Sequence, residues 1–172
     1  KLGLIRCKDL SYLQGMKIVL LTVGKTDVKW VREGLELYCS RIKHYVPFEL
    51  LEIPELKNVS SLSHEQIKQK EGELILKNVK PSDNVILLDE RGKQMGSLEW
   101  AQRLGSIMAC STRNVVFVIG GAYGFSPEVY ARCDDKLSLS KMTFSHQMVR
   151  TIFAEQLYRA FTILKGEPYH HE

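Results

Sequence analysis

VVFVIGGAYG, residues 115–124, and LSLSKMTFSHQMVR, residues 137–150, share one pattern: a short apolar run of strand length leads straight into a loop of small or polar residues. In an open α/β sheet, ligands collect beyond the carboxyl ends of the strands, where such loops lie. Gly120 and Gly121 would let the backbone approach a ligand closely, since a glycine carries no Cβ. We therefore expect these two loops to form the wall of a binding site.

The same alternation extends outward over the rest of the chain. Further apolar runs are separated by segments of helical periodicity, and the complete set of expected strands is 17–23, 48–53, 84–88, 115–119 and 137–139. Strands that alternate with helices are typical of an α/β fold, a mostly parallel sheet with helices on both faces. The rules of chain connection alone predict an unknotted path through such a sheet.

Capping residues mark several helix ends. Ser63 and Gln66 have the spacing of a capping box, and Ser126 precedes a proline and a glutamate, which is typical of a helix start. Asp27 is expected to cap the first helix. Gly166 is expected to end the last helix, which should begin near residue 147.

Length and composition indicate one globular domain. The chain has 172 residues, 44% of them hydrophobic and 26% charged, and no apolar run approaches the ~18 residues that a membrane-spanning helix needs. Residues 1–15 are too mixed for a signal peptide, so we expect an N-terminal extension or a remnant of expression, followed by a single domain at 16–172. The net charge of +4 favours a polyanionic partner such as RNA only slightly.

The cysteines give no sign of a metal site. Cys7, Cys39, Cys110 and Cys133 form no C-x-x-C pair, and no histidine lies at zinc-ligand spacing from any of them. Reduced, mostly buried thiols are usual in cytoplasmic proteins. We expect a cytoplasmic protein with no metal and no membrane association.

Two nucleotide-binding motifs are incomplete. Gly24-Lys25-Thr26 matches the end of a P-loop, but the first glycine of that motif would fall on Val19. Gly120, Gly121 and Gly124 match part of a dinucleotide fingerprint, yet they come late in the chain and lack one glycine. An NAD-type enzyme is therefore only an alternative.

Four segments, in order, resemble one family of RNA-modifying enzymes: IGG-x-x-G, LSLSKMTFSHQMVR, EQLYRAF and the terminal PYHHE. From residue 16 to 172 the chain is similar to the SPOUT methyltransferases that modify large-subunit ribosomal RNA, the RlmH or YbeA-like family. The resemblance implies a homodimer and a C-terminal trefoil knot whose loops form the cofactor pocket. It also implies methyl transfer from S-adenosylmethionine to N3 of a pseudouridine in a hairpin of 23S rRNA in the assembled ribosome.

The motif positions imply which residues hold S-adenosylmethionine. The family's pocket loops correspond to the end of the third strand, the glycine turn and the loop after the last strand, which contain Leu88, Gly120, Leu139, Ser140, Lys141, Met142, Thr143 and Phe144. Backbone groups and apolar side chains suit adenine, which is flat and uncharged. Without the resemblance, Leu139, Met142 and Phe144 would be assigned to the core.

Methyl transfer to an imide nitrogen requires an aligned acceptor and a group that takes its proton. His146 and His170 are the main candidate bases, with His171 ranked below them, and Arg150 and Tyr169 complete the expected catalytic set. We expect the residues after the last helix to form a free tail that folds over the site, where Tyr169 would stack on the acceptor base. His171 departs from the family, which commonly has a basic residue at that position.

The last helix is expected to serve the dimer as well. Arg159 lies nine residues from Arg150 and cannot share its helix face, so we expect it to meet RNA or a partner subunit. The apolar surface expected at the dimer interface consists of Phe153, Leu157, Tyr158, Phe161 and Leu164. The alternative from another functional class is a non-enzymatic ribosome-binding factor, which would need no cofactor pocket.

Overall fold

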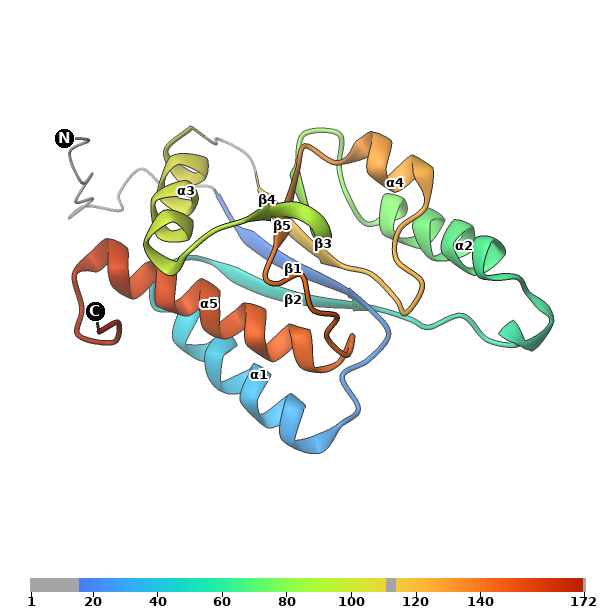
Figure 1. Cartoon of the computed structure of the whole chain (residues 1–172), viewed down its shortest axis with the longest axis horizontal. Helices are drawn as coiled ribbons and strands as arrows, with labels where there is room; N and C mark the ends of the chain where they lie inside the picture. Colours follow the sequence, from blue (N-terminus) through green and yellow to red (C-terminus); the bar gives the residue numbers. More distant parts are fainter. Residues whose placement is uncertain (1–15, 111–113, 172) are drawn as a thin grey trace.

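Five parallel strands form the central layer of the computed structural model, which describes residues 16–110 and 114–171 (Figure 1). The order across the sheet is β2-β1-β4-β3-β5. The expected extension at residues 1–15 lies outside the described residues. The strands are β1 (Ile18–Val23), β2 (Phe48–Ile53), β3 (Asn84–Gln94), β4 (Val115–Ile119) and β5 (Asp135–Ser138).

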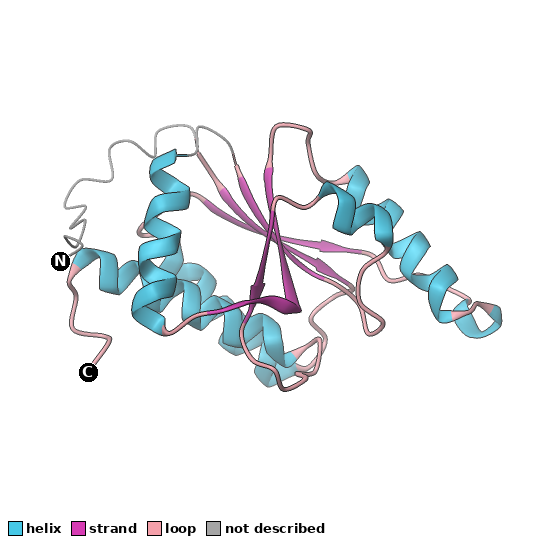
Figure 2. Ribbon diagram, turned by 45° about the horizontal axis from the view of Figure 1, so that its top comes forward, coloured by secondary structure: helices cyan, strands magenta, loops and turns pink. Residues whose placement is uncertain are grey.

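Helices cover both faces of this sheet, as the sequence predicts (Figures 1 and 2). One face packs against α1 (Lys29–Ile42), α3 (Ser97–Cys110) and α5 (Met148–Lys165). The other packs against α2 (His64–Lys77) and α4 (Pro127–Arg132), and a 3-10 turn, η2 (Val59–Ser61), precedes α2. The α/β prediction with helices on both faces is therefore confirmed.

The inner strand β1 explains how the two cores form. All six of its residues are buried, and successive side chains point to opposite faces of the sheet. Leu20 joins the core beneath α1, α3 and α5, whereas Leu21 joins the core beneath α2 and α4. Burying each such side chain contributes roughly 1.5–3 kcal/mol, so continuous apolar runs are the natural sequence for strands covered twice.

Most of the predicted helix ends are confirmed. Ser63 and Gln66 form the reciprocal capping box of α2, the Ser126 side chain caps α4, and Gly166 ends α5 in the left-handed conformation. The prediction for Asp27 was wrong, because the N-cap of α1 is Val28, which makes no side-chain cap bond. The backbone N–H of Asp27 donates instead to the Gln147 side chain, at 3.3 Å.

Strand β3 is longer than its apolar run. The sequence predicts an end at residue 88, but the strand continues to residue 94 across a register shift opposite β5. Gly92 permits this continuation, because a Cβ there would lie 2.7 Å from backbone atoms of Leu137. The irregularity falls at residues 89–92, directly after the buried part of the strand, and this position bears on the site described below. The trefoil knot stays a prediction from the resemblance.

Candidate functional site

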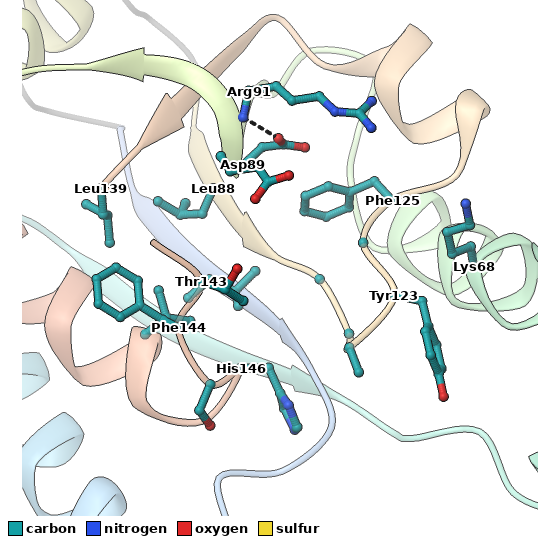
Figure 3. A pocket seen from close by; sticks show the side chains of 18 of the residues that line it. Lys68, Leu88, Asp89, Arg91, Tyr123, Phe125, Leu139, Thr143, Phe144 and His146 are labelled. Atoms are coloured by element: carbon teal, nitrogen blue, oxygen red, sulfur yellow. Dashed lines mark hydrogen bonds between the residues drawn. The ribbon is translucent and has the colours of Figure 1, made fainter. Parts of the chain in front are cut away.

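A cavity of about 890 Å³ lies beyond the carboxyl ends of the central strands (Figure 3). Its walls come from three segments. They are residues 88–91 in the irregular part of β3, the glycine turn after β4 (residues 120–124) and the loop between β5 and α5. The first turns of α2 and α4 contribute the remaining side. This volume is within the range of small-molecule and cofactor pockets, and the position is the one that open α/β sheets use for ligands.

The residues expected to hold a cofactor converge on this cavity. Those that line it are Leu88, Gly120, Leu139, Ser140, Met142, Thr143 and Phe144. Lys141 is exposed and is not among the lining residues. Met142 is 77% exposed and Phe144 36%, so these two side chains are not core residues, whereas Leu139 packs partly against the core.

The loop between β5 and α5 is shaped by its serines. The Ser140 hydroxyl accepts a hydrogen bond from the backbone N–H of Met142 at 2.9 Å, and the Ser145 hydroxyl accepts one from Gln147 at 3.3 Å. The Ser138 hydroxyl donates to the Ser140 carbonyl at 3.0 Å. Such local side-chain bonds stabilise turns in place of regular structure, so the sequence SLSKMTFS forms a loop that wraps one wall of the cavity.

Asp89 is a lining residue that the sequence analysis missed. Its carboxylate accepts hydrogen bonds from the backbone N–H of Arg91, at 2.7 Å, and from the Tyr130 hydroxyl. Burial, and then the hydrogen bond to Asp89, raises the pKa of Tyr130 to about 12, so this phenol stays a donor. An acidic residue directly after a strand was the signal that could have identified it, since such residues often bind ribose hydroxyls.

Glu71 of α2 lies behind the glycine turn. A Cβ on Gly121 would lie 2.4 Å from Glu71 Oε2, and this buried oxygen has no hydrogen-bond partner among the described residues. Burial and, second, the charge of Glu55 raise the pKa of the Glu71 carboxyl. The Glu71 carboxyl therefore lies against the backbone of the glycine turn, and the fold favours the neutral form of this carboxyl.

His146 lines the cavity at the foot of the loop and is the one predicted catalytic residue that the structure brings beside the predicted cofactor residues (Figure 3). Its backbone carbonyl accepts a hydrogen bond from Arg150 Nε at 2.9 Å. The arginine therefore holds the backbone from which the imidazole projects.

Arg150 itself lies outside the cavity lining and is fully buried. Its guanidinium donates to the carbonyls of Val23 and Gly24, at 2.7 and 3.0 Å, and to the Thr26 hydroxyl at 2.8 Å. Burial lowers its pKa, and the nearby carboxylates, Glu52 foremost, oppose that effect. The expectation that Arg150 belongs to the catalytic set is not supported, because its donors are directed at the end of β1, the residues after it and the carbonyl of His146.

The C-terminal tail is docked on its own chain rather than free. The Tyr169 hydroxyl donates to Glu155 at 3.0 Å, its ring packs edge-on against Tyr158, and the Arg159 guanidinium lies 4.8 Å from its centroid. Arg159 also bonds Glu155 at 2.5 Å and lies 3.3 Å from His170 Nδ1. None of these residues lines the cavity, and the tail contacts α5 from Glu155 onward, nine or more residues after His146.

The part of the chain that matches known proteins is nearly the same as the part that the structure describes. Residues 16–170 match a family model described as a predicted SPOUT methyltransferase. The chain belongs to the SPOUT methyltransferase family. It is 54% identical over 157 residues to a Parabacteroides distasonis protein named ribosomal RNA large subunit methyltransferase H, an alignment that covers 91% of this chain and 100% of that protein.

Two further relatives carry the same name. The protein from Christiangramia forsetii is 55% identical over 91% of this chain and 99% of its own length. One from Porphyromonas gingivalis is 55% identical over 91% of this chain and 100% of its own length. In residues 16–110 and 114–171 of this SPOUT protein, no cluster of His, Cys, Asp and Glu could hold a metal ion, and no helix is long and apolar enough to cross a membrane.

Replacing Arg150 with alanine should lower the free energy of unfolding by roughly 3–5 kcal/mol, because the carbonyls that it binds would lose a charged, buried donor. Arg150→Lys should recover only part of this loss, since an ammonium cannot reproduce the forked guanidinium contacts. Urea unfolding measures the free energy of unfolding of both variants. Arg103→Ala, which removes an exposed ion pair to Asp135, is the control and should cost at most ~1 kcal/mol. Equal losses for the two alanine variants would contradict the assignment of Arg150.

Glu71→Gln should stabilise the protein more at high pH than at low pH. Folding raises the pKa of Glu71 above its ordinary 4.5, so its stabilising contribution is complete below that value and is lost as the pH rises through the folded pKa. Glutamine stays neutral and avoids the loss. Urea unfolding at about pH 5 and about pH 8 should show the larger advantage of glutamine at pH 8. An equal advantage at both pH values would show that this carboxyl titrates normally.

Proposed function

We propose that the protein transfers a methyl group from S-adenosylmethionine to N3 of a pseudouridine in a hairpin of 23S rRNA, in the assembled ribosome. The observation that carries the proposal is the convergence of the motif-matched residues of three separate loops on one cavity. Membership of the SPOUT family and the names of relatives above 50% identity support methyl transfer to large-subunit rRNA. A ribosomal substrate would place the protein in the cytoplasm.

The lining of the cavity fits the proposed cofactor chemically. Leu88, Leu139 and Phe144 offer apolar surface to a flat, uncharged purine, and the glycine turn offers backbone groups at close range. Ser140 and Thr143 supply hydroxyls, and Asp89 supplies a carboxylate. A carboxylate held by Tyr130 and by a backbone N–H can accept from ribose hydroxyls, or attract the positive charges of S-adenosylmethionine.

In the proposed reaction, the protein has two main tasks: to position the acceptor base and to take the proton from its N3 atom. S-adenosylmethionine, when bound, supplies an activated methyl group on a sulfonium. The walls of the cavity would align the imide nitrogen of the base behind that methyl, an effect worth on the order of 7–11 kcal/mol at its largest. His146 lies at the cavity and is the residue best placed to take the N3 proton through its ring.

Tyr169 and His170 lie outside the cavity of their own chain, and we propose that they join a site from a second copy of the chain. In their own chain they contact Glu155 and Arg159 of α5, and Glu155 lies nine residues after His146, roughly 14 Å along the helix. Figure 1 shows the C-terminus at the far end of α5 from the loop that leads into it. A homodimer in which the tail of one chain approaches the cavity of the other would reconcile the docked tail with a catalytic role for Tyr169 and His170.

The apolar surface for such a dimer differs from the one that the sequence predicts. Phe153, Leu157 and Phe161 are fully buried within the chain, so the expectation that they form an interface was wrong. They belong to the core beneath α5, which uses nearly all of its apolar face internally. Trp30 and Leu37 of α1 instead are 59% and 46% exposed, and they lie seven residues apart on one side of that helix. We place the dimer contact on this side of α1.

Thr143→Trp should abolish binding of S-adenosylmethionine while the protein stays folded. Thr143 is exposed and lines the cavity, so an indole there would occupy space that the cofactor needs without disturbing the core. Isothermal titration calorimetry with S-adenosylmethionine, NAD and ATP measures the effect and the specificity together. Glu73→Trp, an exposed position on α2 outside the cavity, is the control and should bind normally. Binding of NAD or ATP but not of S-adenosylmethionine by the unmodified chain would overturn the proposed function.

Deleting residues 169–172 should abolish methylation of ribosomes but spare cofactor binding. A mixed dimer of this deletion and Thr143→Trp, isolated with two different tags, should recover about half of the wild-type rate, because one of its two sites is complete. Radiolabelled methyl transfer to ribosomes that lack the modification is the assay. Full activity of the deletion alone would show that the tail has no catalytic role, and an inactive mixed dimer would exclude the exchange of tails.

A further inference from the structure

One side of the cavity is not used by the residues assigned to the cofactor. The predicted cofactor residues belong to β3, the glycine turn and the loop after β5. The opposite side is formed by Glu65 and Lys68 of α2 and by Tyr123. Figure 3 shows Tyr123 and Lys68 on this side, across the cavity from Leu139 and Phe144. The cavity thus has a second wall that the cofactor assignment leaves without a function.

Tyr123 is displayed on this wall by a tight turn. The backbone N–H of Gly124 donates to the carbonyl of Gly121 at 3.2 Å, which closes a four-residue turn with Tyr123 at its third position. Gly124 has a φ of 82°, a conformation that favours glycine. The turn leaves Tyr123 44% exposed, so part of its side chain is accessible to a ligand in the cavity.

A second ring supports Tyr123 from behind. The ring of His64, at the start of α2, stacks on it with centroids 4.0 Å apart and an angle of 20° between the planes. His64 is itself held at the helix end that the capping box of Ser63 and Gln66 fixes. The result is a nearly parallel pair of flat rings at the cavity, which presents a stacking surface to any planar group that enters.

The charges around this surface favour an uncharged planar group over a phosphate. Lys68 is already paired with Glu65 at 2.5 Å. The carboxyl side chains of Asp89 and Glu90 also line the cavity. Apart from Lys68, the described lining has one lysine or arginine, Arg91, to balance them. A phosphate entering here would meet more carboxylates than free cations, whereas a nucleobase carries no charge and needs a π-face.

We infer that Tyr123, backed by His64, is the stacking platform for an unstacked base of the substrate RNA. The inference rests on the proposed function and specifies how the same cavity would recognise its acceptor strand. Single-stranded and hairpin RNA is commonly bound by aromatic side chains on which splayed bases stack, and enzymes that modify a base must present it outside the helix. Tyr123 would be a substrate-positioning residue, and His64 would act through Tyr123 by fixing its ring.

The test compares Tyr123→Ala, Tyr123→Phe and His64→Ala in the full-length chain. Binding to large ribosomal subunits from cells that lack the modification is measured with S-adenosylhomocysteine present, and methyl transfer to the same subunits is measured separately. Tyr123→Ala should weaken subunit binding roughly 5- to 100-fold, the range that base–aromatic stacking supplies, and leave cofactor affinity unchanged. Tyr123→Phe should behave like the wild type, and His64→Ala should fall between the two. Leu98→Ala, which truncates an exposed apolar residue on α3, is the control.

Three outcomes would overturn the platform. Unchanged subunit binding by Tyr123→Ala would show that the ring contacts no base. A loss in Tyr123→Phe equal to that in Tyr123→Ala would assign the effect to the hydroxyl, and a selective loss of cofactor affinity would assign Tyr123 to the cofactor. Methyl transfer by the wild-type chain reports on the proposed function, whereas only the ratios between variants report on the platform, so the two failures are distinguishable.

Discussion

The buried guanidinium of Arg150 is the interaction on which the arrangement of the site depends. It joins the carbonyls at the end of β1 to the start of α5, segments that lie more than 120 residues apart in the chain. The same side chain holds the carbonyl of His146, so the loop that lines the cavity is anchored at its far end. A charge can be buried so completely only where several acceptors face it, and the ends of β1 and of the loop before α5 supply them.

The cavity follows from the parallel sheet together with one departure from it. All five strands are parallel, so the irregular part of β3 and the loops that follow β4 and β5 meet at one edge of the sheet. The irregularity in β3 adds Asp89 to this group by turning the strand at the point where its buried part ends. The glycine turn after β4 contributes its backbone to this cavity and also carries Tyr123.

The parts of this structure that the sequence predicts are those with a local or periodic signal. Apolar runs identify the buried strands, and serine or glycine caps identify helix ends, because both depend on near neighbours. The polar end of β3 has no such signal, since its pairing with β5 holds it extended. Arg150 resembles a solvated arginine in sequence, and its burial depends on carbonyls supplied by a distant strand. The loops expected to hold the cofactor were identified through resemblance to a family, and Asp89 had a signal in its position after an apolar run, whereas Tyr123 required the fold.

The docked tail has a thermodynamic consequence for assembly. Its contacts with Glu155, Tyr158 and Arg159 fix Tyr169 before any second chain arrives. A segment that is already ordered loses little conformational entropy on association, so more of the free energy of the interface remains as affinity. In a dimer that shares its tails, each chain would carry a preformed half of two sites, and dilution below the dissociation constant would remove catalysis without unfolding either chain.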